Sequence, residues 1–194
     1  MRITKIVLLS TLATLAMAQE SNSTAKLSDN ILIKQEGVKY IKMLGKELKT
    51  NLKKAMKEDK TGVKAVTFCL NKAEEITKSV NEKLPKNVKV RRTSLNIRNP
   101  KNSPDEIDTK ILNAYAKNLA DGKFDPKDIK VVKDGNTTRV YKPLLVTKAC
   151  LKCHGENVSS DIKSAIAKKF PKDKAINLKA GTLRGVMVAE IKNK

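Results

Sequence analysis

The chain has 194 residues, with 41 Lys or Arg, 20 Asp or Glu and a single His, which gives a formal net charge of +21 at pH 7. One histidine excludes bis-histidine haem ligation, two-histidine zinc motifs and two-histidine iron triads. Aromatic residues are only 3% of the chain and Trp is absent, so we expect no nucleic-acid partner despite the charge. The charge suits an acidic protein partner or a solvated, lysine-rich surface.

Residues 1–18 have the features of a secretory signal peptide. A short basic start precedes an apolar run, and Ala16 and Ala18 form a small-x-small cleavage site. The apolar run is too short to span a bilayer, and no later segment is long enough, so we expect no membrane span after cleavage. The predicted product is a soluble periplasmic protein, with residues 19–30 as a flexible tether and residues 31–194 as a single domain.

Helices dominate the first half of this domain. Apolar residues recur at spacings of three and four from Ile31 to Ala55, with lysines on the opposite side. A second apolar stripe predicts a helix over residues 62–84. Cys69 falls on this stripe, so we expect its side chain to point inward.

After Pro85 the pattern becomes extended, beginning with a predicted strand over residues 88–95. Ser103 as N-cap, with Pro104 and Glu106 behind it, predicts a third helix that ends near residue 120.

The C-terminal third alternates between strands and one helix. Residues 129–133 and 136–141 are expected to form a hairpin around Asp134-Gly135, followed by a short helix over residues 161–170 and a last strand over residues 183–191. Long helices first, then a meander with helical insertions, indicate an α+β fold built on one antiparallel sheet.

The chemistry of the chain is concentrated at Cys150-Leu151-Lys152-Cys153-His154, a C-x-x-C-H motif of the kind that attaches c-type haem. Two thiols three residues apart on a helical turn reach the two vinyl groups, and the histidine that follows is positioned to bind the iron. This attachment is made outside the cytoplasm, so the motif agrees with the signal peptide.

Two other sites fit the same cysteines. Cys69, Cys150, Cys153 and His154 have the ligand count of a structural zinc site, although the adjacent Cys153 and His154 would strain a tetrahedral geometry. The C-x-x-C pair alone also fits a disulfide or a thioredoxin-like redox pair, but this leaves Cys69 and His154 unexplained.

If haem is bound, the second axial ligand is a methionine, a thiolate, a lysine or an open position, because no second histidine exists. Met43 and Met187 fit a core-filling role better than ligation. Cys69 is the better candidate, since it is the only thiol outside the attachment motif. A buried structural cysteine is the alternative that the spacing leaves open.

Several separated motifs resemble one family, in the same order along the chain. They are VRRTSL at 90–95, RNP at 98–100, NSPD at 102–105, CLKCHG at 150–155, FPKDKA at 170–175 and LRG at 183–185. This is the c-type haem domain with a PAS-like fold, found as a stand-alone exported protein and as the sensor part of bacterial kinases, cyclases and chemoreceptors. The resemblance covers about residues 60 to 191. It implies a PAS-like antiparallel sheet with one covalent haem c, and His154 and Cys69 as its axial ligands.

Given this resemblance, the candidates to pair with the haem propionates are Arg91, Arg92, Arg98 and Arg184, because guanidinium groups bind carboxylates bidentately. A thiolate opposite a histidine lowers the reduction potential, and its bond to iron weakens on reduction. We therefore expect a non-enzymatic redox or gas sensor that can take CO or NO and is read by a protein partner. The alternative is a periplasmic electron carrier whose lysine-rich surface docks an acidic partner.

Overall fold

A four-stranded antiparallel sheet forms the centre of the molecule. The computed structural model of the chain describes the backbone of residues 10–193 and the side chains of residues 28–193. The strands lie in the order β1-β4-β3-β2, and each neighbouring pair is antiparallel. Their bounds are β1 Val88–Thr93, β2 Lys130–Asp134, β3 Thr137–Leu145 and β4 Leu183–Lys192. The last strand of the chain therefore lies inside the sheet, between β1 and β3.

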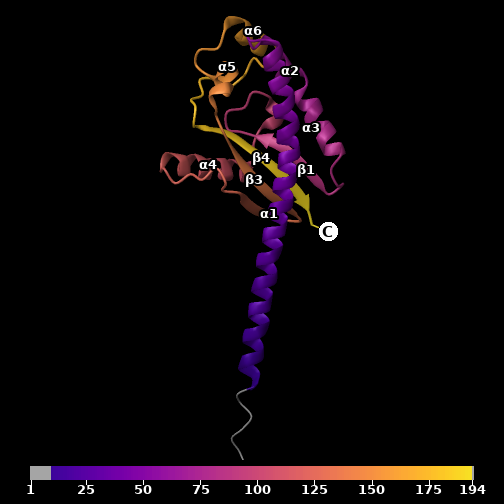
Figure 1. Ribbon diagram of the computed structural model, residues 1–194. Helices are drawn as coiled ribbons and strands as arrows, with labels where there is room; N and C mark the ends of the chain where they lie inside the picture. The colour runs from indigo at the N-terminus through magenta and orange to yellow at the C-terminus, as the bar shows by residue number, and fades with distance from the viewer. Residues whose placement is uncertain (1–9, 194) are drawn as a thin grey trace, which may run out of the picture.

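The long helix α1 (Ser10–Glu58) crosses one face of this sheet (Figure 1). Its inward residues repeat at helical spacing and are buried, namely Tyr40, Ile41, Leu44 and Leu48. They form the largest core with side chains from β1, β3 and β4. A Cβ added to Gly37 would lie 2.5 Å from the side chain of Val140, so glycine lets α1 lie this close to the sheet.

Helix α1 also includes residues 19–30, the segment predicted to be a flexible tether. The prediction rested on Ser, Asn, Thr and Asp, each of which disfavours a helix by only about 0.5 kcal/mol relative to alanine. The segment contains neither Gly nor Pro, which would interrupt a helix more strongly. The predicted signal peptide lies partly outside the described residues, which begin at residue 10.

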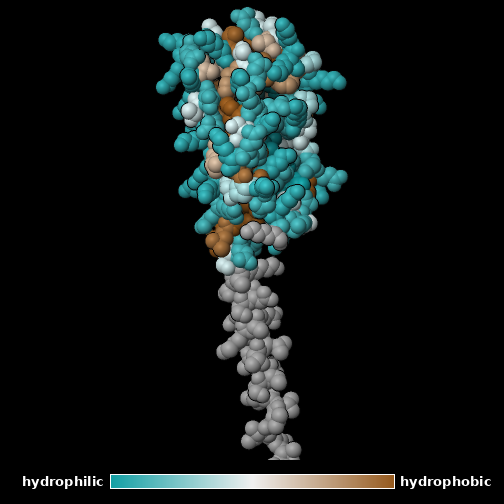
Figure 2. Space-filling model, turned by 90° about the vertical axis from the view of Figure 1, so that its right-hand side faces the viewer, coloured by the Kyte–Doolittle hydropathy of each residue, from teal (hydrophilic) through white to brown (hydrophobic). Residues whose placement is uncertain are grey.

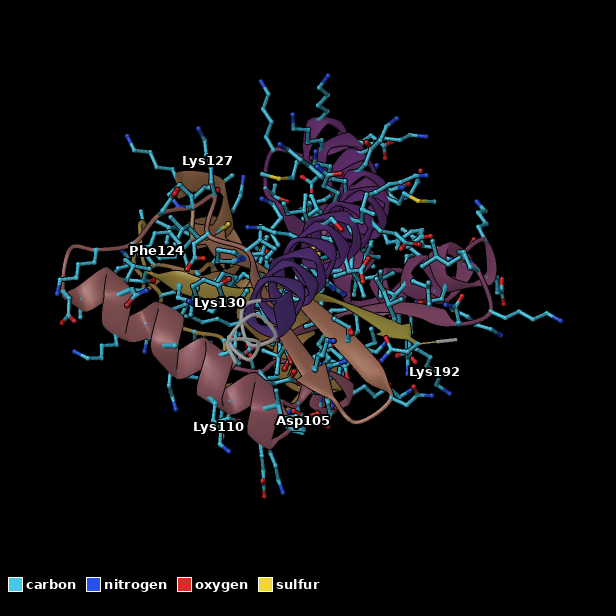
Figure 3. All side chains as sticks on the ribbon, turned by 90° about the horizontal axis from the view of Figure 1, so that it is seen from below. Asp105, Lys110, Phe124, Lys127, Lys130 and Lys192 are labelled. Atoms are coloured by element: carbon cyan, nitrogen blue, oxygen red, sulfur yellow. The ribbon has the colours of Figure 1, made fainter. Side chains whose placement is uncertain are left out.

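Helix α4 (Glu106–Ala120) covers the opposite face of the sheet, as the view from below in Figure 3 shows. Val140 and Tyr141 are neighbours in β3 and point to opposite faces. Val140 packs in the core under α1, whereas Tyr141 packs with Leu112 and Tyr115 of α4. The sheet is thus buried on both faces.

The N-cap of α4 is Asp105 rather than the predicted Ser103. The carboxylate of Asp105 accepts a hydrogen bond from the N–H of Asp108 at 2.8 Å, and the side chain of Asp108 accepts one from the N–H of Asp105. Ser103 is used earlier, because its hydroxyl donates to the carbonyl of Pro100 at 2.6 Å and closes the short turn η1 (Pro100–Asn102).

Four further helices are α2 (Val63–Asn71), α3 (Ala73–Glu82), α5 (Leu151–His154) and α6 (Ser160–Lys169). The helix predicted over residues 62–84 is therefore interrupted at Lys72. Helices α2, α5 and α6 gather at one end of the sheet (Figure 1). A small separate core joins α2 to α6 through Val66, Ile162 and Ile166.

The prediction of an α+β, PAS-like fold with an antiparallel sheet is confirmed. The predicted hairpin is present, but its turn residues are Gly135 and Asn136, because Asp134 already pairs with Thr137. No helix within residues 10–193 is long and apolar enough to cross a bilayer.

Candidate functional site

The turn η2 (Lys148–Cys150) runs directly into α5 and holds Cys150, Cys153 and His154 on one short helical segment. Both thiols of the motif are free and partly accessible. Gly155 ends the segment by donating its N–H to the carbonyl of Leu151 at 2.9 Å. A Cβ at Gly155 would lie 2.6 Å from the same oxygen, so a larger residue would push the segment apart.

The imidazole of His154 is held in one tautomer. Its Nδ1 lies 2.7 Å from the carbonyl oxygen of Ala175, and because a carbonyl only accepts, Nδ1 carries the proton. The lone pair of Nε2 is then available. Burial and the charges of Arg184 and Arg98 lower the pKa of His154 to about 3, so the ring is neutral at pH 7. A neutral imidazole whose Nδ1–H donates to a carbonyl is the usual form of a metal-binding histidine.

The loop over residues 173–178 supports this segment from one side. Leu178 donates its N–H to the carbonyl of His154 at 2.8 Å, and Asn177 donates to the carbonyl of Gly155 at 3.3 Å. Asn177 has a φ of 56°, in the left-handed region that asparagine tolerates better than most residues. Two consecutive carbonyls of the histidine turn are therefore bound by the same loop.

Cys69 of α2 is predicted to point inward, and in the structure its side chain is accessible to solvent. The buried residues of α2 are Ala65 and Val66, one turn earlier. Burial by the surrounding protein nevertheless raises the pKa of the Cys69 thiol, with a smaller contribution from Cys153. The thiol is therefore accessible but has protein on several sides. The apolar stripe identified the side of α2 that faces the chain, and Cys69 remains accessible on that side.

Three arginines act on Cys69 through their charges and partly offset the rise in its pKa, namely Arg92, Arg98 and Arg184. Burial lowers the pKa of Arg92, and burial together with the charges of Arg98 and Arg92 lowers that of Arg184 to about 10. Among the described residues, neither Arg92 nor Arg184 has a carboxylate within 4.0 Å (the ion pairs present involve other bases). Two guanidinium groups without a carboxylate partner, one of them near both Cys69 and His154, suit an anionic ligand.

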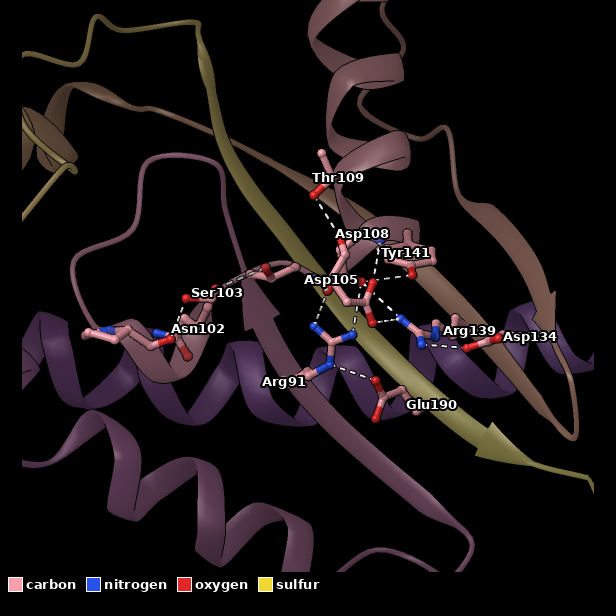
Figure 4. Close-up of polar contacts among 12 residues, drawn as sticks. Arg91, Asn102, Ser103, Asp105, Asp108, Thr109, Asp134, Arg139, Tyr141 and Glu190 are labelled. Atoms are coloured by element: carbon pink, nitrogen blue, oxygen red, sulfur yellow. Dashed lines mark hydrogen bonds and ion pairs between the residues drawn. The ribbon is translucent and has the colours of Figure 1, made fainter.

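Arg91 is not part of this group. Its Nη1 donates to Asp108 at 2.7 Å and its Nε donates to Glu190 at 2.7 Å, in the polar network drawn in Figure 4. Consecutive strand residues point to opposite faces, so Arg91 and Arg92 cannot both face one site. The prediction that Arg91 binds a propionate is therefore not supported, and the alternation along β1 is the signal that could have excluded it.

Arg98 is close to the site but already paired. Its Nε donates to Asp173 at 2.9 Å, and its Nη2 donates to the carbonyls of Cys153 at 2.7 Å and Ala175 at 3.2 Å. Sequence reasoning missed Asp173 and Ala175 as members of the site. Asp173 stands in the 170–175 motif and could have been found there, whereas Ala175 acts through its backbone, which the residue type does not reveal.

The other predicted ligands are not assembled. Within the described part of the chain, no three His, Cys, Asp or Glu side chains converge in a way that could hold a metal ion, so the zinc prediction has no structural support. Met187 is buried in the main core next to α1, and Met43 is 36% exposed on α1. Neither methionine was favoured as an iron ligand, and their places in the fold suit the packing role.

A family model described as Tll0287-like matches residues 11–191 of the chain. Among solved structures, the crystal structure of the cyanobacterial haem-protein Tll0287 is similar, with a TM-score of 0.52 and 23% sequence identity. The match covers 63% of this chain and 70% of that one. At this identity the structural similarity establishes the fold alone. No curated protein matches the chain.

Proposed function

The chain belongs to the Tll0287-like family, and from this premise we propose that it is a haem-binding protein with one haem c attached through Cys150 and Cys153. His154 is the first axial ligand in this proposal. The observation that carries it is the state of the motif, in which two free thiols and an imidazole with an available Nε2 lie on one short segment.

The residues of the site fit the chemistry of this group. Thioether bonds require two unpaired thiols, and both are free. Iron requires a neutral imidazole nitrogen, and the hydrogen bond from Nδ1 to Ala175 leaves Nε2 to supply it. Two propionates require cationic partners, and Arg92 and Arg184 have no carboxylate partner in the described structure. Bound haem would supply an iron centre that changes oxidation state and, with an open axial position, takes a diatomic gas.

We propose Cys69 as the second axial ligand. Its thiol is accessible, and it is near enough to Cys153 for the charge of that thiol to help raise the pKa of Cys69. Thiolate ligation lowers a reduction potential, and a thiolate bond weakens when the iron gains an electron. Loss of the Cys69 ligand on reduction would open a position for CO or NO.

These properties suit a redox or gas sensor that is not an enzyme and whose state is read by a signalling or redox protein. The proposed location is the periplasm, reached with the signal peptide over residues 1–18. The second candidate function is an electron carrier, favoured by the net charge of +21 and by the hydrophilic surface in Figure 2, which suit docking to an acidic partner.

An absorption spectrum separates these functions. The full chain would be produced by cells that export it and mature c-type cytochromes, and measured as ferric, dithionite-reduced and reduced-plus-CO samples. Absence of covalent haem would overturn the proposal, and replacement of both Cys150 and Cys153 by Ser is the control that should abolish attachment. Loss of the thiolate band on reduction with CO binding supports the sensor. An unchanged six-coordinate spectrum that ignores CO supports the carrier.

A further inference from the structure

Arg98 and Asp173 form a buried ion pair beside the segment that carries His154. Their side chains are only 9% and 8% exposed, and the Nε of Arg98 donates to Oδ2 of Asp173 at 2.9 Å. The pair joins the loop that follows β1 to the loop that precedes β4. Because the guanidinium of Arg98 already binds a carboxylate and two backbone carbonyls, this arginine is less available to an anionic ligand than one without such partners.

The pair also binds both backbone polar groups of Ala175. Oδ1 of Asp173 accepts a hydrogen bond from the N–H of Ala175 at 2.8 Å, and Nη2 of Arg98 donates to the carbonyl of Ala175 at 3.2 Å. That carbonyl is the acceptor for Nδ1 of His154 at 2.7 Å. The same Nη2 donates to the carbonyl of Cys153, the residue before the histidine, at 2.7 Å. One guanidinium thus binds both the histidine turn and the acceptor of the histidine ring.

We propose that Arg98 and Asp173 are positioning residues for His154, which fix the carbonyl of Ala175 and thereby select the tautomer with a free Nε2. The group that Nε2 would bind is taken from the proposed function. The selection of the tautomer by Arg98 and Asp173 does not depend on that function. Arg98 therefore differs from Arg92 and Arg184, which have no carboxylate partner among the described residues.

The single histidine makes the tautomer directly measurable, because imidazole nitrogens in a ¹⁵N-labelled chain give one set of signals. The full chain without attached haem would be compared with R98K and D173N. R98K keeps the positive charge but replaces the planar fork with one ammonium, so it loses the fixed geometry in which Nε binds Asp173 while Nη2 binds both carbonyls. D173N keeps the side-chain volume and removes the charge.

The matched control is R91K. Arg91, like Arg98, forms ion pairs through its guanidinium fork, but its partners are Asp108 and Glu190 in the other network (Figure 4). Wild type and R91K are expected to show one tautomer, protonated at Nδ1. R98K and D173N are expected to show nitrogen shifts moved toward those of a tautomer mixture. Thermal unfolding of each variant establishes that it is folded at the temperature of the measurement, and if D173N does not fold, R98K alone decides.

An unshifted Nδ1–H tautomer in a folded R98K chain would overturn the inference. An equal shift in R91K would also overturn it, because the effect would then be general loosening of the fold. In haem-loaded chains, R98K should keep the covalent haem but change the ferric absorption spectrum, whereas R91K should not. If wild type takes no haem at all, the proposed function fails while the tautomer result still decides the role of Arg98 and Asp173.

Discussion

The side-chain amide of Asn81 in α3 forms two hydrogen bonds with the backbone of Val90 in β1. Nδ2 of Asn81 donates to the carbonyl of Val90 at 2.9 Å, and the N–H of Val90 donates to Oδ1 of Asn81 at 2.7 Å. β1 is an edge strand, so this amide takes the place of a neighbouring strand. The contact also fixes the strand that carries Arg92, two residues further on.

Replacing Asn81 with Leu is therefore expected to lower the free energy of unfolding by about 2 to 3 kcal/mol, because it leaves two buried backbone groups without partners. Urea unfolding followed by circular dichroism measures this change. The control is N51L, since Asn51 makes one exposed hydrogen bond to its own helix and its loss should cost about 0.5 kcal/mol or less. Equal losses for both variants would contradict the role given to Asn81.

The network around Asp108 predicts a larger effect. Asp108 is fully buried and accepts hydrogen bonds from Arg91 at 2.7 Å and from the hydroxyl of Tyr141 at 2.9 Å (Figure 4). D108A would leave Arg91 with Glu190 as its remaining acid and the buried hydroxyl of Tyr141 without its acceptor, and removing one partner of a buried pair typically costs about 3 to 5 kcal/mol. K78A breaks the exposed pair Lys78–Glu82 and should cost about 0.5 kcal/mol or less in the same urea titration. A D108A chain as stable as K78A would show that the network contributes little.

The assignment of Cys69 as a ligand predicts a spectroscopic change without loss of haem. C69S should retain covalent haem, because attachment uses Cys150 and Cys153, but its ferric spectrum should differ from that of wild type. M43L, a change at a residue 36% exposed on α1, should leave the spectrum unaltered. A ferric spectrum identical to wild type in C69S would remove the thiolate assignment.

Arg184 is expected to influence the reduction potential through its charge. A positive group near the iron favours the ferrous form, so R184Q should lower the potential, on the order of 50 mV or about 1 kcal/mol for one electron. R91Q should leave it unchanged, because Arg91 is paired with Asp108 and Glu190 in the other network. Spectroelectrochemical titration of both variants measures the difference, and equal potentials for R184Q and wild type would exclude Arg184 from the haem environment.

Asp59 predicts a pH dependence at the turn between α1 and α2. Hydrogen bonds from the hydroxyl of Thr61 and from the backbone of Lys64 and Thr61 lower the pKa of Asp59 from 3.8 to about 2. The unfolded carboxyl binds its proton at the higher pH, so the contribution of Asp59 is complete above pH 4 and is lost as the pH falls to 2. The difference in unfolding midpoint between wild type and D59A should therefore shrink over this range. A difference that stays constant from pH 5 to pH 2 would contradict the prediction.

Periodicity located almost every helix and strand, because apolar spacing follows directly from which side of an element is covered. The capping pattern failed where a competing local interaction decides the boundary, as at Ser103, whose hydroxyl closes η1 instead of capping α4. Periodicity also did not reveal the accessibility of Cys69, since a stripe shows which side of a helix faces the chain but not how far a side chain is covered there.

The reactive groups of the candidate site could be predicted from the sequence. The residues that hold those groups in place were harder to predict. The motif alone identified Cys150, Cys153 and His154 as candidate residues, because two thiols and an imidazole at this fixed spacing form a recognisable pattern. The roles of the arginines depend on which carboxylate each one meets in the folded chain, and those carboxylates are distant in sequence. Arg98 meets Asp173, 75 residues later, and nothing local to either residue indicates the pairing.

The position of β4 has a consequence for folding. Residues 183–192 form the strand between β1 and β3 and pair with both. Before β4 is in place, β1 has no strand to join among the described strands, and the sheet consists of two separate parts. Its pairing with β1 joins residues far apart in the sequence, and such contacts form slowly. Docking of β4 is therefore expected to be the late step that closes the sheet.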